Sequence, residues 1–177
     1  MLANESMLDA VMVTLEALNG THAAAMLRWM QDPVVAKNLG LRSNPSAEKT
    51  TTWLERAATD ESIEARAILL DGHHVGNVVL DQIDRHVAKA RLSIYVGEQA
   101  ARARGVGKAA VRLALALAFD ELGLHKVWLT VHERNATAIA AYKAAGFVTE
   151  GTHRDEFVID GERIAEIYMG RLKTDPA

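Results

Sequence analysis

Two arginines and two glycines between residues 102 and 107 carry the clearest ligand-binding pattern in the chain. They are Arg102, Arg104, Gly105 and Gly107 in the stretch RARGVGKAA, and a helix is expected to begin at about Val106. The first N–H groups of a helix have no acceptor within the helix, and the helix dipole is positive at this end. Glycines let a ligand approach that backbone closely, and the arginines add positive charge. The pattern therefore predicts a site for an anion, most directly a phosphate or pyrophosphate.

The same glycines also fit a dinucleotide-binding pattern. Gly105, Gly107 and Ala110 match G-x-G-x-x-A, which is typical of nicotinamide-dependent dehydrogenases. In that fold the glycine turn follows its strand directly, whereas residues 97–104 intervene here. The neighbouring strands are also predicted to form antiparallel hairpins, and no further strand–helix–strand units follow. A dehydrogenase is therefore the weaker interpretation, and titration with NADH distinguishes it.

A second pattern lies in the stretch NATAIAAYKAAGF, residues 135–147. Asn135 and Tyr142 are two helical turns apart, so they share one helix face with Ile139. Asn135 is a typical N-cap, and Gly146 is expected to end the helix. From spacing alone, packing explains Tyr142 best.

The first sixty residues are predicted to be mostly helical. A short strand over Val11–Leu15 is followed by a helix capped by Thr21 that runs through Met30. Asp32-Pro33 opens a short helix to about Asn38, and Ser46 caps another helix through about Ala58. The apolar faces of these helices must pack on the sheet that follows.

The remaining chain alternates strands and helices in an order that predicts a mixed sheet. Asp71-Gly72 and Asp160-Gly161 are strong hairpin signals. Three antiparallel strands lead into a buried helix, and a crossover of this length makes the next strand parallel to the third. The expected strands are 64–70, 75–83, 90–96, 126–131, 147–159 and 163–172, and the expected helices are 106–122 and 135–145. Both helices begin at the carboxyl ends of neighbouring parallel strands, where ligands of open α/β sheets collect.

Composition limits the function classes. The chain has 177 residues, 49% of them hydrophobic and 24% charged, which indicates one globular domain. A net charge of −3 argues against general binding to nucleic acid or a membrane surface. The chain has no cysteine, so it has no disulfide and no thiolate nucleophile. His73-His74 and His132-Glu133 lack metal-site spacing, so no metal is expected. No signal peptide or membrane span is evident, and the expected location is the cytoplasm.

The glycine loop, the stretch WLTVHERNATAIAAYKAAGF and the tail EGTHRDEFVIDGERIAEIYMGRL together resemble the GNAT superfamily of N-acetyltransferases. The similar branch contains ribosomal-protein, polyamine, amino-acid and amino-sugar acetyltransferases. The resemblance covers about residues 64–172 and implies an acetyl-CoA-binding core there, with an acceptor-side helical part at about 20–60. It implies a single α/β domain over 1–177 with the GNAT fold: a mixed, mostly antiparallel central sheet, a splayed parallel strand pair and flanking helices.

The resemblance also assigns roles to residues. It places the pyrophosphate of acetyl-CoA on the loop and pairs the pantetheine arm with the end of the preceding strand, whose backbone N–H at Val96 suits a developing oxyanion. Asn135 matches a cofactor contact, and Tyr142 matches both a cofactor contact and the tyrosine that protonates the leaving thiolate. The implied cofactor-binding residues are Tyr95, Val96, Arg102, Arg104, Gly105, Val106, Gly107, Lys108, Asn135 and Tyr142.

The general base and the acceptor are less determined. Some relatives carry a glutamate on the strand before the tyrosine helix, where this chain has Thr130. Glu98 is the candidate base, with Asp81 and bulk water as alternatives. The implied acceptor is a primary amine of a small molecule such as an amino acid, amino sugar or polyamine. A protein N-terminus and a non-catalytic acyl-CoA sensor are alternatives, and the resemblance leaves a homodimer open.

Overall fold

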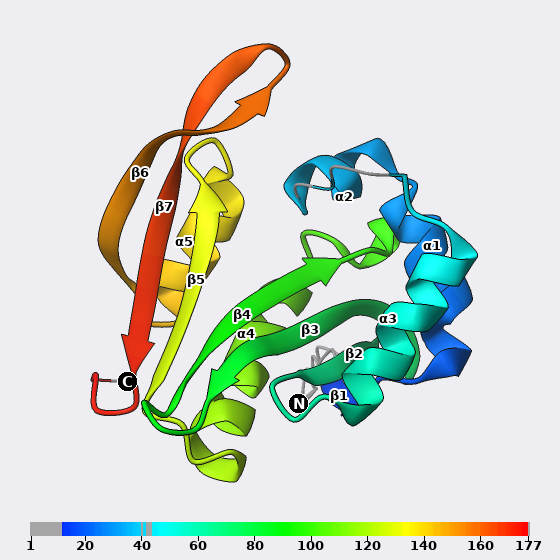
Figure 1. The fold of residues 1–177 in the computed structure, drawn as a ribbon, viewed down its shortest axis with the longest axis horizontal. Coiled ribbons are helices and arrows are strands. Elements are labelled where there is room, and N and C mark those ends of the chain that lie inside the picture. Colours follow the sequence, from blue (N-terminus) through cyan, green and yellow to red (C-terminus); the bar gives the residue numbers. More distant parts are fainter. Residues whose placement is uncertain (1–11, 40, 42–43, 177) are drawn as a thin grey trace, which may run out of the picture.

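The protein is built on one seven-stranded sheet with helices on both faces (Figure 1). The structure, a computed structural model, describes residues 12–39, 41 and 44–176. The strand order is β1-β2-β3-β4-β5-β7-β6. The strands are β1 Val13–Ala17, β2 Glu64–Leu70, β3 His73–Asp84, β4 Lys89–Val96, β5 Lys126–His132, β6 Val148–Ile159 and β7 Glu162–Leu172. The expected mixed, mostly antiparallel sheet is thereby confirmed.

The two Asp-Gly turns form the hairpins that the sequence predicts. Asp71 and Gly72 have φ values of +50° and +80°, and Asp160 and Gly161 have +53° and +81°. Aspartate and glycine tolerate this left-handed conformation, which matches the twist of the flanking strands. The pairs β2–β3, β3–β4 and β6–β7 are all antiparallel.

Three helices precede β2: α1 Ala23–Met30, α2 Pro33–Asn38 and α3 Ala47–Thr59. Asp32 and Ser46 cap α2 and α3 as expected. The prediction of Thr21 as a cap was wrong, because the Asn19 side chain accepts from the Thr21 N–H and starts a short 3-10 turn at Gly20–His22. The first strand was predicted too early: β1 ends at Ala17, and Val11 lies outside the described residues.

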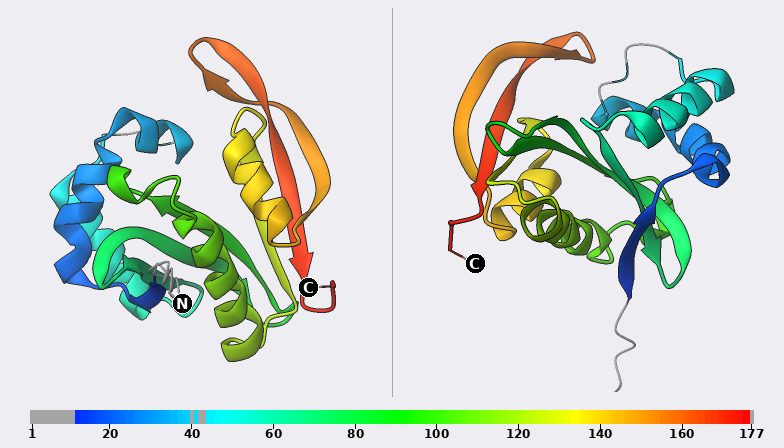
Figure 2. Two further views of the ribbon diagram at one scale, coloured as in Figure 1. Left: turned by 180° about the vertical axis from the view of Figure 1, so that it is seen from behind. Right: turned by 60° about the horizontal axis from the view of Figure 1, so that its bottom comes forward.

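The hydrophobic core lies between the sheet and α4 Val106–Ala116. This helix packs against β1, β3 and β4, and α5 Ala136–Ala144 lies beside it. Figure 2 shows α4 and α5 on the face of the sheet opposite α1 and α3. The predicted helix to Leu122 keeps α geometry only to Ala116 and continues as a π-helical turn, Leu117–Glu121. Gly123 then follows with φ +67°.

The parallel pair β4–β5 is joined at one end only. Their register is limited to Lys89↔Lys126, Ala90↔Val127 and Arg91↔Trp128. Beyond Arg91, β4 stays paired with β3, and β5 stays paired with β7. The two strands diverge toward their carboxyl ends (Figure 1), as the splayed pair expected from the sequence. None of the described helices is long and apolar enough to cross a membrane.

Candidate active site

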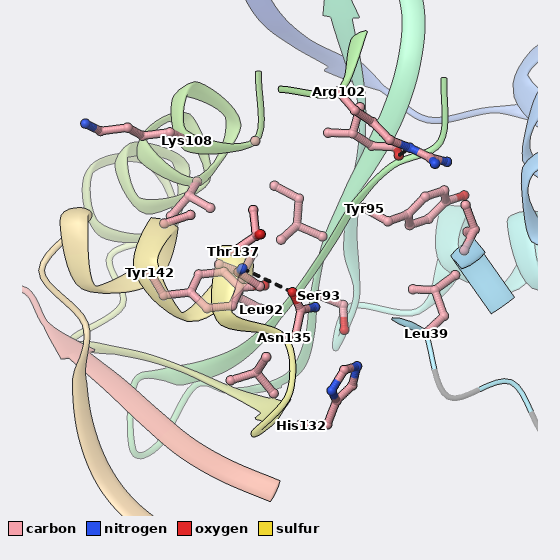
Figure 3. A pocket seen from close by; sticks show the side chains of 18 of the residues that line it. Leu39, Leu92, Ser93, Tyr95, Arg102, Lys108, His132, Asn135, Thr137 and Tyr142 are labelled. Carbon is pink, nitrogen blue, oxygen red and sulfur yellow. Dashed lines mark hydrogen bonds between the residues drawn. The ribbon is translucent and has the colours of Figure 1, made fainter. Parts of the chain in front are cut away.

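A cavity of about 740 Å³ occupies the space where β4 and β5 diverge. Its walls come from the second half of β4, the glycine loop and the start of α4 on one side. The end of β5, Asn135 and one face of α5 form the other side, and α2, Phe157 and Glu166 complete it. Figure 3 shows Ser93, His132, Asn135 and Tyr142 around this space. It is the carboxyl-edge crevice that the topology predicted.

The glycine loop forms one end of the cavity. Ala103 and Gly105 both have positive φ, +60° and +79°, and Gly105 is the N-cap of α4 without a side-chain cap. The first backbone bond of the helix runs from Ala109 N to Gly105 O, 3.0 Å. Since no earlier amide has an acceptor within the helix, the N–H groups of Val106, Gly107 and Lys108 are free to bind an anion.

The two arginines of the loop differ in their contacts and in their position relative to the cavity. Arg102 donates from Nε to the Val96 carbonyl, 3.1 Å, and from Nη2 to the Gly97 carbonyl, 2.9 Å. Its guanidinium also lies 3.5 Å from the Asp32 carboxylate. Arg102 therefore ties the loop to the end of β4, whereas Arg104 is exposed and does not line the cavity. Their predicted contacts with a pyrophosphate remain predictions.

Asn135 and Tyr142 both line the cavity. The Asn135 side chain accepts from Ala138 N at 3.2 Å, so it caps α5 as well. Tyr142 is 9% exposed, and its ring packs against Phe147. Burial raises the pKa of Tyr142 to about 12, because desolvation disfavours the phenolate. The phenol therefore stays protonated near neutral pH, as a proton donor must.

The candidate bases lie elsewhere. Glu98 does not line the cavity; its carboxylate accepts from Arg28 at 3.1 Å and from Trp29 Nε1 at 3.4 Å. Asp81 accepts two bonds from Arg91, 2.8 and 2.6 Å, across the β3–β4 pair. The structure therefore does not bring Glu98 or Asp81 together with Tyr142.

Several polar residues of the cavity were not predicted, among them Lys37, His132 and Glu166. Lys37 belongs to α2, His132 ends β5, and Glu166 is the register partner of His132 on β7. They meet only because α2 and the β6–β7 hairpin reach the end of β5. The one available signal was the position of His132 two residues beyond Thr130, on the same face of the strand.

A metal site finds no support in the part of the chain that the structure describes. No group of three or more His, Cys, Asp or Glu side chains lies close enough together there to hold an ion. Acetyl transfer from a thioester needs no metal, since the acyl group is already activated.

Known proteins similar to this chain are acetyltransferases. Residues 13–148 match the family described as the acetyltransferase (GNAT) domain. The L-amino acid N-acetyltransferase AaaT of Escherichia coli (strain K12) is 32% identical over 68% of this chain and 75% of its own length. The spermidine N(1)-acetyltransferase of the same strain is 26% identical over 84% and 74%. The spermidine N-acetyltransferase from Vibrio cholerae, solved in complex with CoA and spermine, superposes with a TM-score of 0.87 at 22% identity. This superposition covers 92% of this chain and 96% of that one, which confirms the expected fold.

Proposed function

The chain belongs to the acetyltransferase (GNAT) domain family and is an acetyl-CoA-dependent N-acetyltransferase, and we propose that it acetylates a primary amine of a small molecule inside the cavity between β4 and β5. The observation that carries the proposal is the divergence of these strands after three residue pairs. It opens one space that contains both an unsatisfied helix N-terminus and a buried tyrosine.

The proposed cofactor position follows from the groups on the cavity wall. The pyrophosphate lies against the free amides of Val106, Gly107 and Lys108, where the dipole of α4 favours an anion. The pantetheine arm runs along the edge of β4 at Tyr95 and Val96, which has no strand partner on the β5 side. Added chains pair with such an edge through their amides. The thioester then points toward Tyr142.

Direct transfer in a ternary complex fits these parts. The acceptor amine attacks the thioester carbonyl, and backbone N–H groups at the end of β4 stabilise the oxyanion. The C–S bond breaks as the Tyr142 hydroxyl donates its proton to the leaving sulfur. Burial raises the pKa of a thiol as well as that of the phenol, so the leaving sulfur also favours its protonated form in this environment.

The charges of the cavity restrict the acceptor. Glu166 is the single carboxylate among the described lining residues. Three of the four basic lining side chains are paired with carboxylates that do not line the cavity: Lys37 with Asp160, Arg91 with Asp81 and Arg102 with Asp32. A polyamine carries several ammonium groups, which need several acidic partners. An amino acid or amino sugar carries one ammonium group. We therefore place amino acids and amino sugars ahead of polyamines. The expectation of a cytoplasmic location rests on the sequence alone.

The test is thiol release from acetyl-CoA with a panel of acceptors: the L-amino acids, glucosamine, spermidine and a tripeptide with a free N-terminus. We expect turnover with one of the first two classes and a lower kcat/KM with spermidine. Preferred turnover of the tripeptide would favour a protein N-terminus as acceptor. Tight CoA binding without turnover of any amine would instead favour an acyl-CoA sensor.

A further inference from the structure

His132 carries two buried ring nitrogens that bind nothing in the structure. Among residues 12–39, 41 and 44–176, neither Nδ1 nor Nε2 has a hydrogen-bond partner, and both are shielded from solvent. Buried polar atoms without partners are rare in folded proteins, because leaving them unpaired is costly. The side chain lines the cavity, and a rotation of the ring toward that space would bring a nitrogen to a ligand bound there.

The end of β5 positions this imidazole. Val127, Leu129 and Val131 alternate into the core, so Thr130 and His132 lie on the opposite face of the strand. The ring packs edge-on against Phe157 of β6, with centroids 6.4 Å apart. Figure 3 shows His132 and Tyr142 bordering the same space. A substrate in the cavity can thus meet both side chains.

The surroundings keep the imidazole neutral. Burial lowers the pKa of His132 below its usual value of 6.5, and the positive charges of Lys37 and Arg134 lower it further. Glu166 faces His132 across the β5–β7 pair, but its carboxylate is shared with His153 Nδ1 at 3.3 Å. A neutral imidazole at pH 7 has an acceptor nitrogen for a proton.

We propose that His132 is the proton acceptor of the acetyl transfer and takes a proton from the acceptor ammonium inside the cavity. The inference rests on the proposed function and supplies the base that it lacks. The ammonium loses one proton to the free imidazole nitrogen and becomes the nucleophile. The N–C bond forms, the C–S bond breaks, and the sulfur leaves with the Tyr142 proton. The second proton of the attacking nitrogen returns to the tyrosine oxygen, and His132 releases the first to solvent.

The pH dependence of His132→Gln tests this assignment, with His132→Asn as a second variant. Glutamine keeps polar atoms in place of the ring but accepts no proton near neutral pH. We expect kcat/KM at pH 7 to fall by about a hundredfold or more, as for loss of a general base, while CoA binding by calorimetry is unchanged. The wild-type acid limb, centred below pH 6.5, should disappear. The defect should shrink as the pH approaches the pKa of the acceptor ammonium, because solvent then supplies the free amine.

A matched control is His125→Gln, at the other end of β5, where the exposed side chain does not line the cavity. It should retain the wild-type rate and pH profile. A His132→Gln enzyme with the wild-type kcat and the same acid limb would overturn this proposal alone. Absence of turnover by the wild type with every amine would overturn the proposed function and this proposal with it.

Histidine NMR gives a readout without turnover: we expect a resonance of the wild type, missing in His132→Asn, that titrates below pH 6.5 and moves on addition of CoA and amine. A His132 resonance whose titration is unchanged by CoA and amine would contradict the assignment.

Discussion

The ring of Trp29 lies against the α-carbon of Gly97, so that a β-carbon at position 97 would overlap ring atoms Cγ and Cδ2. Trp29 belongs to α1 and is 3% exposed, and Gly97 directly follows β4. The contact therefore fixes an acceptor-side helix to the strand end that borders the cavity. Trp29 also packs against His74, with ring centroids 4.7 Å apart.

Replacing Gly97 with alanine should destabilise the protein. The tryptophan ring cannot move aside easily because it is buried, so we expect a loss of about 1–3 kcal/mol of unfolding free energy, as for other overpacked cores. Urea unfolding followed by Trp fluorescence measures this. Gly151→Ala is the control, because an added β-carbon there meets nothing within 4 Å. Equal stability of both variants would contradict the packing argument.

Tyr142→Phe removes only the hydroxyl that we assign to proton donation. The ring should keep its packing against Phe147, so CoA binding should be unchanged. We expect kcat to fall roughly ten- to a thousand-fold, measured by thiol release. Tyr168→Phe is the matched control, since Tyr168 stacks on Trp128 and does not line the cavity. Unchanged turnover of Tyr142→Phe would remove the proton-donor role.

Gly107→Ala separates ligand binding from helix stability. An added β-carbon at Gly107 meets nothing within 4 Å in the ligand-free protein. Alanine favours a helix over glycine by about 0.5–1 kcal/mol, so the ligand-free variant should be at least as stable as the wild type. A phosphate close to this backbone would meet the new methyl group, and we expect CoA affinity to fall by about tenfold, or about 1.4 kcal/mol. An unchanged Kd would place the diphosphate elsewhere.

Unfolding free energy should decrease as the pH falls below 6.5, partly because of His74. Burial is the main cause that lowers the pKa of His74, and its Nε2 lies 2.8 Å from Asn77 Oδ1. A lowered pKa means that the unfolded chain binds more protons, so this stabilisation is full above pH 6.5 and is lost as the pH falls through the lowered pKa of the folded state. His74→Gln can keep the contact to Asn77 without titrating. Urea unfolding at pH 7.5, 6.5 and 5.5 should show a shallower pH dependence in this variant, and an identical slope would contradict the assignment.

Glu98→Gln should leave the acid limb of the pH–rate profile in place. The Glu98 carboxylate accepts hydrogen bonds from Arg28 and Trp29 and does not line the cavity. Its loss should therefore affect stability and not proton transfer. Because Arg28 is exposed, we expect a change of less than about 1 kcal/mol. Loss of the acid limb in this variant would restore Glu98 as the base.

The sequence predicted those parts of the fold that local patterns determine. The Asp-Gly turns identified two hairpins, and the caps at Asp32, Ser46 and Asn135 identified three helix starts. The π-helical turn at Leu117–Glu121 escaped prediction because its residues favour an ordinary helix, and only packing changes its hydrogen bonding. The capping of the first helical turn by Asn19 instead of Thr21 shows the same limit, since both residue types cap well.

Most residues predicted to bind the cofactor line the cavity, whereas Lys37, His132 and Glu166 on its other side were not predicted. The amides at Gly105–Lys108 belong to one short segment, so their geometry can be inferred from the glycines. His132, by contrast, is buried by Phe157 and influenced by Lys37, which come from distant parts of the chain. No spacing rule joins these residues, and only the folded arrangement reveals that the imidazole has no partner.

The divergence of β4 and β5 also links the stability of the protein to its supply of cofactor. The edge of β4 beyond Arg91 has no strand beside it on the β5 side, so a bound pantetheine would add hydrogen bonds that the empty protein lacks. A ligand that binds only the folded state adds RT ln(1 + [L]/Kd), about 2.7 kcal/mol at a hundredfold excess over Kd. The folded fraction, and with it resistance to heat and proteases, should therefore rise and fall with the concentration of free coenzyme A species.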